Sequence, residues 1–405
     1  MVCELLTVAQ MAQADAATIA SGTPGFTLMQ AAGEAVVQAI VQRWSPCATI
    51  VLCGPGNNGG DGFVVATRLQ VLGWPVRVAL LGCIDALTDD AALAAQAWQV
   101  QCGAAHGPVS TLDAGCLDGM SLAVDALFGA GLSRPLEGLA ADVLAKAHAR
   151  NVPIVAIDVP SGVWGDTGEV TGAVAAMLTV TFFRLKPAHR LMPARSLCGE
   201  VVVADIGIAP EVLHDIKPQT WDDQPPVWRN VWPHMDEAGH KYHRGHALIW
   251  GGPEMTGAGR LAARAAARIG AGLVTVCTPR SAWPVYATAL ECIMVHPLDG
   301  ITATGWQSGL KTLLDDDRLS AMLIGPGALG GSSAAGIRGL VLTMLASGRP
   351  VVLDADALSA FHEDPALLFA AIAGHSRPVV LTPHGGEFVR LFGMHQVSSA
   401  DGKLA

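Results

Sequence analysis

The chain has 405 residues, of which 51% are hydrophobic and 15% charged, and its net charge at pH 7 is −10. This length suits two or three domains with their own cores, and the composition excludes a largely disordered chain. The acidic balance, with Lys and Arg scattered rather than clustered, excludes the basic stripe that backbone-driven binding of nucleic acid requires.

The chain shows no signal for a membrane or for export. No uninterrupted apolar run reaches the roughly 18 residues that cross a bilayer. Met1–Leu6 contains Glu4 and lacks the basic and apolar regions of a signal peptide. We therefore expect a cytoplasmic protein without a membrane partner; the sequence does not decide its oligomeric state, and a homo-oligomer stays open.

Two helices are expected to open the fold, near residues 8–20 and 28–43. Thr7 with Gln10, and Thr27 with Gln30, each match a capping box, in which a Thr hydroxyl and a later Gln satisfy free amides of the first helical turn.

After these helices, β-rich runs alternate with Ala-rich stretches of helical length, a pattern typical of parallel strands with crossover helices. The expected strands of the first half are Thr49–Cys53, Val76–Leu80, Leu122–Asp125, Ile154–Asp158, Leu178–Phe182 and Val201–Val203. Those of the second half are Ala247–Trp250, Val274–Thr278, Cys292–His296, Met322–Ile324, Val351–Asp354 and Val379–Thr382.

Between about Pro210 and His234 the pattern gives way to Pro, Trp and Asp with no period of 2 or 3.6. The sequence therefore predicts an α/β protein with a first domain over 1–212, a linker over 213–234 and a second domain over 235–405.

The densest functional signal runs from Cys53 to Gly62, with five glycines between a buried strand and an amphipathic helix. Glycines let backbone amides approach a ligand closely and place a helix N-terminus beside it. The segment fits neither a Walker A loop nor G-x-G-x-x-G. A plain strand-to-helix turn is the alternative, but a turn has no use for Asn57, Asn58 and Asp61.

Two further strand ends carry polar residues, around Asp125 and around Asp158 to Ser161. Because strand ends of an open parallel sheet form the ligand crevice, we expect three such ends to meet at one site. A lone Asp there is often only a helix cap. Asn58, Asp125 and Ser161 offer hard oxygen ligands for an alkali or alkaline-earth cation. Asp158, with no basic residue near it in sequence, is the candidate for proton transfer.

These residues resemble the NAD(P)H-hydrate epimerase domain. The resemblance rests on Asn57-Asn-Gly-Gly-Asp61, Asp125-Ala-Leu-Phe-Gly129 and Asp158-Val-Pro-Ser-Gly162, and it takes in Leu28-Met-Gln-Ala-Ala-Gly33 and Thr181-Phe-Phe-Arg-Leu-Lys186, so that it spans about 1–210. It implies a Rossmann-like three-layer sandwich that interconverts the R and S forms of hydrated NADH or NADPH; the sequence does not show which of the two is preferred.

The resemblance also implies roles for individual residues. The hydrated dinucleotide would be held by Asn57, Asn58, Gly59, Gly60, Asp61, Gly129, Ala130, Gly131, Leu132, Ser133, Arg134, Pro135 and Asp158. A potassium ion would be held by Asn58, Asp125 and Ser161, and Asp158 would move the proton.

The second half has glycine-rich strand ends of its own at Gly251-Gly252, Gly325-Pro-Gly327 and His384-Gly-Gly-Glu387. It resembles the ribokinase-like, ADP-dependent NAD(P)H-hydrate dehydratase, which the family often fuses behind the epimerase. That resemblance implies that Ala258, Gly327 and His384 contact the substrate and that ADP and magnesium take part. A structural His384 is the alternative.

One departure from that family stands out. Its glycine-rich nucleotide loop, which ends in Gly-Asp and carries the catalytic base, has no match after Glu387. We therefore expect a truncated, incomplete ribokinase-like domain that is inactive as a dehydratase, with Val379–Thr382 at a bare sheet edge. Two other readings stay open: a non-catalytic dinucleotide-binding scaffold, and small-molecule kinase activity in the second half.

Overall fold

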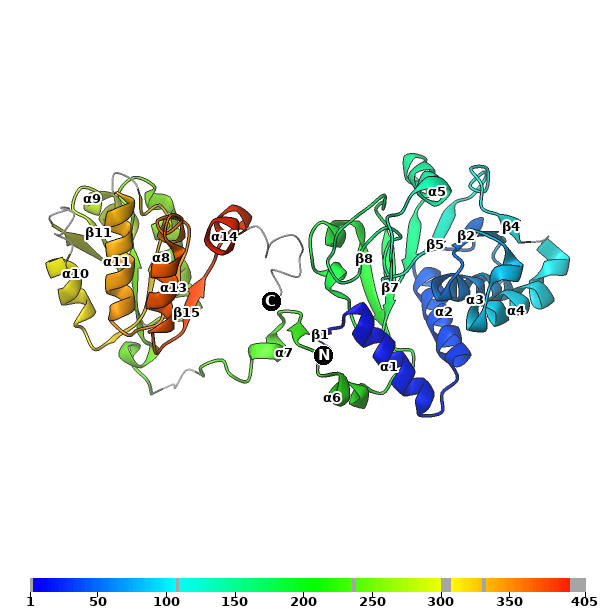
Figure 1. The fold of residues 1–405 in the computed structure, drawn as a ribbon, viewed down its shortest axis with the longest axis horizontal. Helices are drawn as coiled ribbons and strands as arrows, with labels where there is room; N and C mark the ends of the chain where they lie inside the picture. Colours follow the sequence, from blue (N-terminus) through cyan, green and yellow to red (C-terminus); the bar gives the residue numbers. More distant parts are fainter. Residues whose placement is uncertain (1–2, 107–108, 235–237, 300–306, 330–332, 394–405) are drawn as a thin grey trace. The chain divides into compact units, whose positions relative to one another are not determined.

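The computed structural model describes residues 3–106, 109–234, 238–299, 307–329 and 333–393. The chain divides into two compact units, Met1–Trp232 and Pro233–Ser398, and each is described by itself. Both are α/β units built on a parallel sheet (Figure 1). No helix in these ranges has the length and apolar character needed to span a membrane.

The first unit holds a seven-stranded parallel sheet in the order β4-β3-β2-β5-β6-β7-β8. Its strands are β2 (Thr49–Cys53), β3 (Val76–Leu80), β4 (Ser110–Thr111), β5 (Leu122–Ala126), β6 (Ile154–Ile157), β7 (Leu178–Phe182) and β8 (Glu200–Ala204). Every residue of β2, β5, β6 and β7 is buried, as expected for strands that carry helices or loops on both faces.

Alternate residues of β2 show that the sheet has a core on each side. Val51 and Cys53 pack into a core with α1 (Val8–Ala20), α2 (Gly25–Val41), α3 (Asn57–Val71) and α4 (Asp89–His106). Ile50 and Leu52 pack into the opposite core with α5 (Gly138–Ala149). The three-layer arrangement predicted for this half is therefore confirmed.

Of the two predicted capping boxes, the structure has one and lacks the other. Thr7 caps α1 and its hydroxyl accepts from the amide of Gln10, as predicted. The box at Thr27 is wrong, because α2 already begins at Gly25. Pro24 precedes α2 in an extended conformation, and a proline at this position has no amide that would need a cap.

The predicted linker, 213–234, contains regular structure. α6 (Leu213–Ile216) packs against the core that includes α1. β9 (Thr220–Trp221) pairs antiparallel with β1 (Glu4–Leu5). These segments therefore belong to the first unit; they are too short to show a period in the sequence. α7 (Pro225–Trp228) follows.

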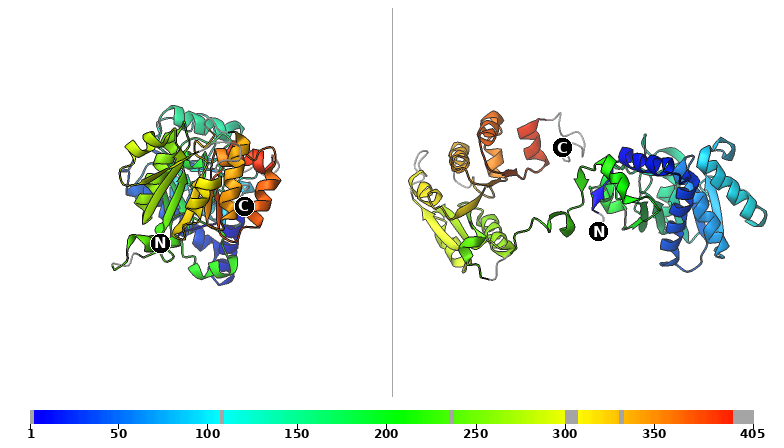
Figure 2. Two further views of the ribbon diagram at one scale, coloured as in Figure 1. Left: turned by 90° about the vertical axis from the view of Figure 1, so that its left-hand side faces the viewer. Right: turned by 90° about the horizontal axis from the view of Figure 1, so that it is seen from below.

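The second unit has a six-stranded parallel sheet in the order β12-β11-β10-β13-β14-β15. Figure 2 gives two further views of the ribbon. The strands are β10 (His246–Trp250), β11 (Leu273–Pro279), β12 (Met294–Leu298), β13 (Leu319–Ile324), β14 (Val351–Leu353) and β15 (Val379–Leu381). The helices are α8 (Thr256–Ile269), α9 (Trp283–Ala289), α10 (Gln307–Leu314), α11 (Ala334–Ala346), α12 (Asp356–Ser359), α13 (Pro365–Ala373) and α14 (Gly385–Phe392). In the described part of this sheet β15 is the last strand, and Val380 is 50% exposed.

Candidate active site

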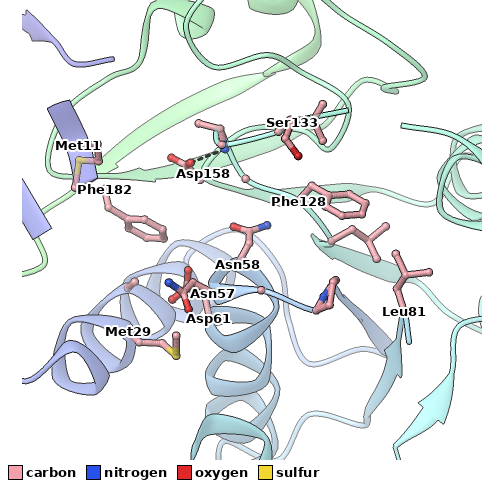
Figure 3. A pocket seen from close by; sticks show the side chains of 18 of the residues that line it. Met11, Met29, Asn57, Asn58, Asp61, Leu81, Phe128, Ser133, Asp158 and Phe182 are labelled. Carbon is pink, nitrogen blue, oxygen red and sulfur yellow. Dashed lines mark hydrogen bonds between the residues drawn. The ribbon is translucent and has the colours of Figure 1, made fainter. Parts of the chain in front are cut away.

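Strand order fixes where a ligand site can form in the first unit. The chain runs from β2 outward through β3 to β4, and then returns to β5 on the other side of β2 before running to β8. The loops that leave β2 and β5 therefore diverge, and such a point in an open parallel sheet is where ligands bind. A cavity of about 1330 Å³ lies there, lined by residues that include Asn58, Gly129 and Asp158 (Figure 3).

The loop after β2 passes close to the loop after β5. The amide of Gly54 donates to Ala126 O at 2.9 Å, and a Cβ on Gly54 would lie 1.8 Å from Leu127 O. A Cβ on Gly59 would lie 1.9 Å from Gly54 O. Only glycine fits these two positions, because the obstructing atoms belong to the backbone.

The predicted binding segment after β2 divides in two. Asn57, Asn58 and Asp61 line the cavity from the first turns of α3 (Figure 3). Gly59 and Gly60 are buried instead, and a Cβ on Gly60 would meet the Met29 side chain. Both glycines let α3 pack closely beneath the cavity, and their binding role stays a prediction.

The predicted binding segment after β5 lies entirely on the cavity. Its members are Gly129, Ala130, Gly131, Leu132, Ser133, Arg134 and Pro135. The amide of Ala130 donates to Asp158 Oδ2 at 2.9 Å, which ties the segment to the end of β6 (Figure 3).

Asp158 is held from several sides. Its backbone is left-handed, with φ 67°, which is rare for a residue other than glycine. Its Oδ1 accepts from the Thr181 hydroxyl at 2.9 Å and lies 2.7 Å from Lys186 Nζ. The Lys186 side chain is 3% exposed and that of Asp158 is 16% exposed. This is therefore an ion pair largely removed from water.

His189 fixes the backbone of both members of this pair. The amide of Lys186 donates to His189 Nδ1 at 2.9 Å, so the ring proton belongs on Nε2, which donates to Asp158 O at 2.9 Å. Burial and the nearby Lys186 charge lower the pKa of His189 to about 4, so the ring is neutral at pH 7.

The carboxyl groups around the cavity differ in the direction in which their pKa values are shifted. Burial would raise the pKa of Asp158, but the charge and hydrogen bond of Lys186 and the Ala130 amide outweigh it and hold that pKa at about 2. Burial raises the pKa of Asp15, on α1, to about 6, against the effect of Lys186. Burial also raises the pKa of Asp61 well above its usual value, and the charges of Asp158 and Asp15 add to this.

The predicted cation ligands are partly brought together. The Ser161 hydroxyl donates to Asp125 Oδ1 at 2.6 Å, and the Ser161 amide donates to Oδ2 at 2.8 Å. Asn58 lies across Gly129: a Cβ on Gly129 would be 3.2 Å from both Asn58 Oδ1 and Asp158 Oδ2. The Asn58 amide nitrogen is buried with no hydrogen-bond partner among the described residues.

The chemistry of this trio fits a cation. Asp125 is 1% exposed, burial raises its pKa, and only the hydrogen bonds from Ser161 and Leu127 oppose that rise. A buried carboxylate without a cationic partner is costly, and a hard cation would relieve it. Within the described ranges, no cluster of three or more His, Cys, Asp or Glu could hold a metal.

In the second unit the strand order reverses between β10 and β13, so the loops that leave these two strands also diverge. A Cβ on Gly252 would lie 1.6 Å from Gly327 O, and Gly327 has φ 69°, so the two glycine loops touch. Ala258 lies in the first turn of α8, just beyond the Gly252 loop. These two predicted substrate residues therefore flank one switch point.

His384 is engaged in its own helix terminus. Its Nδ1 accepts from the Gly386 amide at 3.0 Å, and its own amide donates to Glu387 Oε2 at 2.9 Å, which completes a capping box for α14. Its Nε2 lies 3.1 Å from Glu387 Oε1. The structural role considered as the alternative is therefore present, although the side chain is 66% exposed and open to a ligand.

Comparisons with known proteins match both units. The family described as "YjeF-related protein N-terminus" matches residues 25–188, and the family described as "NAD(P)H-hydrate dehydratase" matches residues 247–404. The bifunctional NAD(P)H-hydrate repair enzyme Nnr of Salinibacter ruber is 38% identical over 419 residues, which cover 96% of this chain and 75% of that protein. This chain belongs to the bifunctional NAD(P)H-hydrate repair enzyme family.

Other relatives match most of this chain or one part of it. The bifunctional enzyme of Coxiella burnetii is 35% identical over 78% of this chain and 63% of its own length. The NAD(P)H-hydrate epimerase of Rhodobacter capsulatus is 41% identical, over 51% of this chain and 99% of its own length. A Bacillus subtilis ADP/ATP-dependent NAD(P)H-hydrate dehydratase, co-crystallized with ATP/Mg²⁺, is 28% identical over 42% of this chain and 55% of its own, with a TM-score of 0.31.

Family membership confirms the resemblance of both halves and the α/β fold class. An epimerase-type unit precedes a dehydratase-type unit in this repair-enzyme chain. The predicted absence of a Gly-Asp loop concerns residues after Glu387, of which 394–405 lie outside the described residues.

The sequence-based interpretation missed two residues that line the repair enzyme's cavity and one that contacts Asp158 from beside it. It named Asp158 as a carboxylate with no basic residue nearby, whereas Lys186 pairs with it from 28 positions along the chain. It also missed Asp15 and His189. The quoted segment Thr181–Lys186 held the signal for the lysine, because its place after a buried strand puts it at the same sheet edge as Asp158.

Proposed function

We propose that the first unit interconverts the R and S forms of hydrated NADH and NADPH in the cavity between the β2 and β5 loops. The observation that carries this proposal is the Asp158–Lys186 pair, a carboxylate held ionised by a buried lysine at the ligand crevice of an epimerase-type fold. A fixed anion there stabilises positive charge that develops on the substrate ring.

The segments that line the cavity offer different groups for binding. The Gly129–Pro135 segment offers backbone groups and Arg134, which suit the diphosphate of a dinucleotide. Asn57, Asn58 and Asp61 offer polar groups at the N-terminus of α3. Asp158 faces the reacting ring in this assignment and is its catalytic residue.

The experiment follows one epimer over time. Purified R-hydrate of NADH is incubated with the full chain, and the two epimers are separated by chromatography, with the enzyme-free rate subtracted. Wild-type chain should bring the epimers to equilibrium, and Asp158→Asn should lose at least a hundredfold in rate. Unchanged R-hydrate with the wild-type chain would refute the assignment and leave a non-catalytic dinucleotide-binding protein as the better description.

We further propose that a potassium ion binds at Asn58, Asp125 and Ser161. The buried carboxylate of Asp125, which has no cationic partner among the described residues, and the Asn58 Oδ1 oxygen beside Gly129 support this site. The ion would fix the β2 and β5 loops and offset phosphate charge. Replacing potassium by choline should lower both the melting temperature and the epimerase rate of the wild-type chain, whereas Asp125→Asn should respond to neither ion.

For the second unit we propose substrate contacts at Ala258, Gly327 and His384, with ADP and magnesium as its nucleotide and metal. The meeting of the Gly252 and Gly327 loops at a switch point supports the site. Full chain mixed with the S-hydrate, ADP and magnesium chloride tests for recovery of NADH by its absorbance. His384→Ala should weaken binding of the hydrate, as measured by calorimetry.

A further inference from the structure

Asp15 reaches the epimerase cavity from outside the sheet. Met11, Asp15 and Ile19 of α1 all line the cavity, and their spacing of four residues puts them on one face of the helix. Figure 3 shows Met11 on the same side of the cavity as Phe182 and Asp158. Asp15, one helical turn further along, therefore faces the same space.

The direction of this side chain is fixed because α1 is firmly held. Thr7 caps the helix, the Val8 amide donates to Asp166 Oδ1 at 2.7 Å, and Ala14 is fully buried beside Asp15. α1 also lies outside the range that matches the epimerase-type family, which begins at residue 25.

Asp15 differs from Asp158 and Asp125 in its partners. Asp158 and Asp125 have their oxygens satisfied by protein groups, as described above. Asp15 forms no hydrogen bond or ion pair within the described residues, and it is not fully buried. The charged groups that act on it are Lys186 from the end of β7 and Asp158 from the end of β6, and Asp15 in turn acts on Asp61 of α3.

We propose that Asp15 is the acid–base residue of the epimerase, the group that protonates the departing hydroxyl while Asp158 remains an anion beside the ring. This assignment rests on the proposed epimerase function. Two carboxyl groups whose surroundings drive them to opposite protonation states divide the roles of acid and anion between them. Burial places the pKa of Asp15 near 6, close to the pH at which an acid catalyst works best.

The chemistry balances without any further reactant. The substrate carries its added hydroxyl on a ring carbon bonded to the ring nitrogen. Asp15 gives its proton to that oxygen, the C–O bond breaks, water departs, and the nitrogen lone pair forms a C=N bond whose positive charge faces Asp158. Water then adds to either face of this carbon, the C–O bond forms again, the electron pair returns to nitrogen, and the released proton restores Asp15.

The experiment compares Asp15→Asn, Asp15→Glu and the wild-type chain in the epimerisation assay between pH 5 and 9. Asp15→Asn should lower kcat about a hundredfold or more with a small change in KM, and it should lose the fall in rate at high pH that deprotonation of Asp15 causes in the wild type. Asp15→Glu keeps the acid and should keep part of the rate and the fall at high pH. Gln13→Ala, on the exposed side of α1, serves as the control for the helix.

A chemical rescue separates catalysis from structure. Sodium formate should restore part of the rate of Asp15→Ala, and sodium chloride at equal ionic strength should not, because only formic acid can supply the missing proton. An active wild type, with Asp15→Asn within about threefold of it and an unchanged pH profile, overturns the role of Asp15 alone. A wild-type chain that leaves the R-hydrate unchanged overturns the epimerase function as well.

Discussion

Asp158 combines two unfavourable features, a left-handed backbone and a carboxylate largely removed from water, and its neighbours compensate both. Its amide donates to Val180 O at 2.8 Å, and His189 donates to its carbonyl oxygen, so the strained backbone is held on either side. Lys186 and Thr181 hold the side chain. Strain of this kind persists only where surrounding contacts over-determine it, which is typical of a catalytic position.

Removing the lysine of this pair should be costly. Lys186→Met leaves Asp158 buried without a counter-charge, and we expect a loss of about 3–5 kcal/mol in the free energy of unfolding at pH 7. Urea unfolding measures the loss. Arg43→Met, which breaks the more exposed pair with Glu200, is the matched control and should cost less than about 1 kcal/mol. Equal losses in the two variants would contradict the assigned importance of burial.

The pH dependence of this contribution has a defined sign. Because the pKa of Asp158 is lowered to about 2 from an ordinary value of 3.8, its ionised form stabilises the fold above pH 4. The stabilisation is lost as the pH falls from 4 through 2. Unfolding curves should therefore show a steeper acid loss for the wild type than for Asp158→Asn over that window.

Asp15 should have the opposite effect on stability. Its pKa is raised to about 6, so its ionisation opposes folding above that pH and has no effect below pH 4. Asp15→Asn should therefore increase the free energy of unfolding by about 1–2 kcal/mol at pH 8 and leave it unchanged near pH 4. Urea unfolding at the two pH values decides this, and an equal gain at both would rule out ionisation as its cause.

At the scale of elements, the close contact between the β2 and β5 loops requires that residue 54 has no side chain. Gly54→Ala would drive a Cβ into Leu127 O, and neither loop can yield without moving a strand end. We expect a loss of about 2–4 kcal/mol and a weaker epimerase. Gly56→Ala, where nothing lies within 4 Å of the added Cβ, should cost less than about 1 kcal/mol in urea unfolding.

Strands of this protein could be predicted more reliably than helix starts or the site. Parallel strands buried on both faces are nearly continuous apolar runs, so Thr49–Cys53 could be located to the residue. Val76–Leu80 could be located equally well, although Arg77 within it is exposed. The start of α2 was wrong because Thr27 with Gln30 matches a capping box, whereas the helix already begins at Gly25. From the sequence Lys186 could be placed only at the same sheet edge as Asp158, and Asp15 could not be placed at the site at all. The order of the strands and the docking of α1 bring them together.

At the scale of the whole molecule, the two units have separate cores. Those of the first unit lie on the two faces of its sheet, and those of the second gather around residues such as Trp250 and Phe361. We expect two unfolding transitions in calorimetry. Gly54→Ala should lower only one of them, and Phe361→Ala, at a site with no exposed surface, should lower only the other by about 3–5 kcal/mol. A single transition shifted by both variants would contradict independent folding.

The pairing of β1 with β9 has a practical consequence for anyone who wishes to express the epimerase alone. A recombinant fragment ending at residue 212 would discard Thr220 and Trp221 and leave Glu4 and Leu5, which lead directly into α1, without their partners in β9. A fragment ending at Trp232 keeps the pairing of β1 with β9. This pairing holds the segment that leads into α1, the helix that carries Asp15.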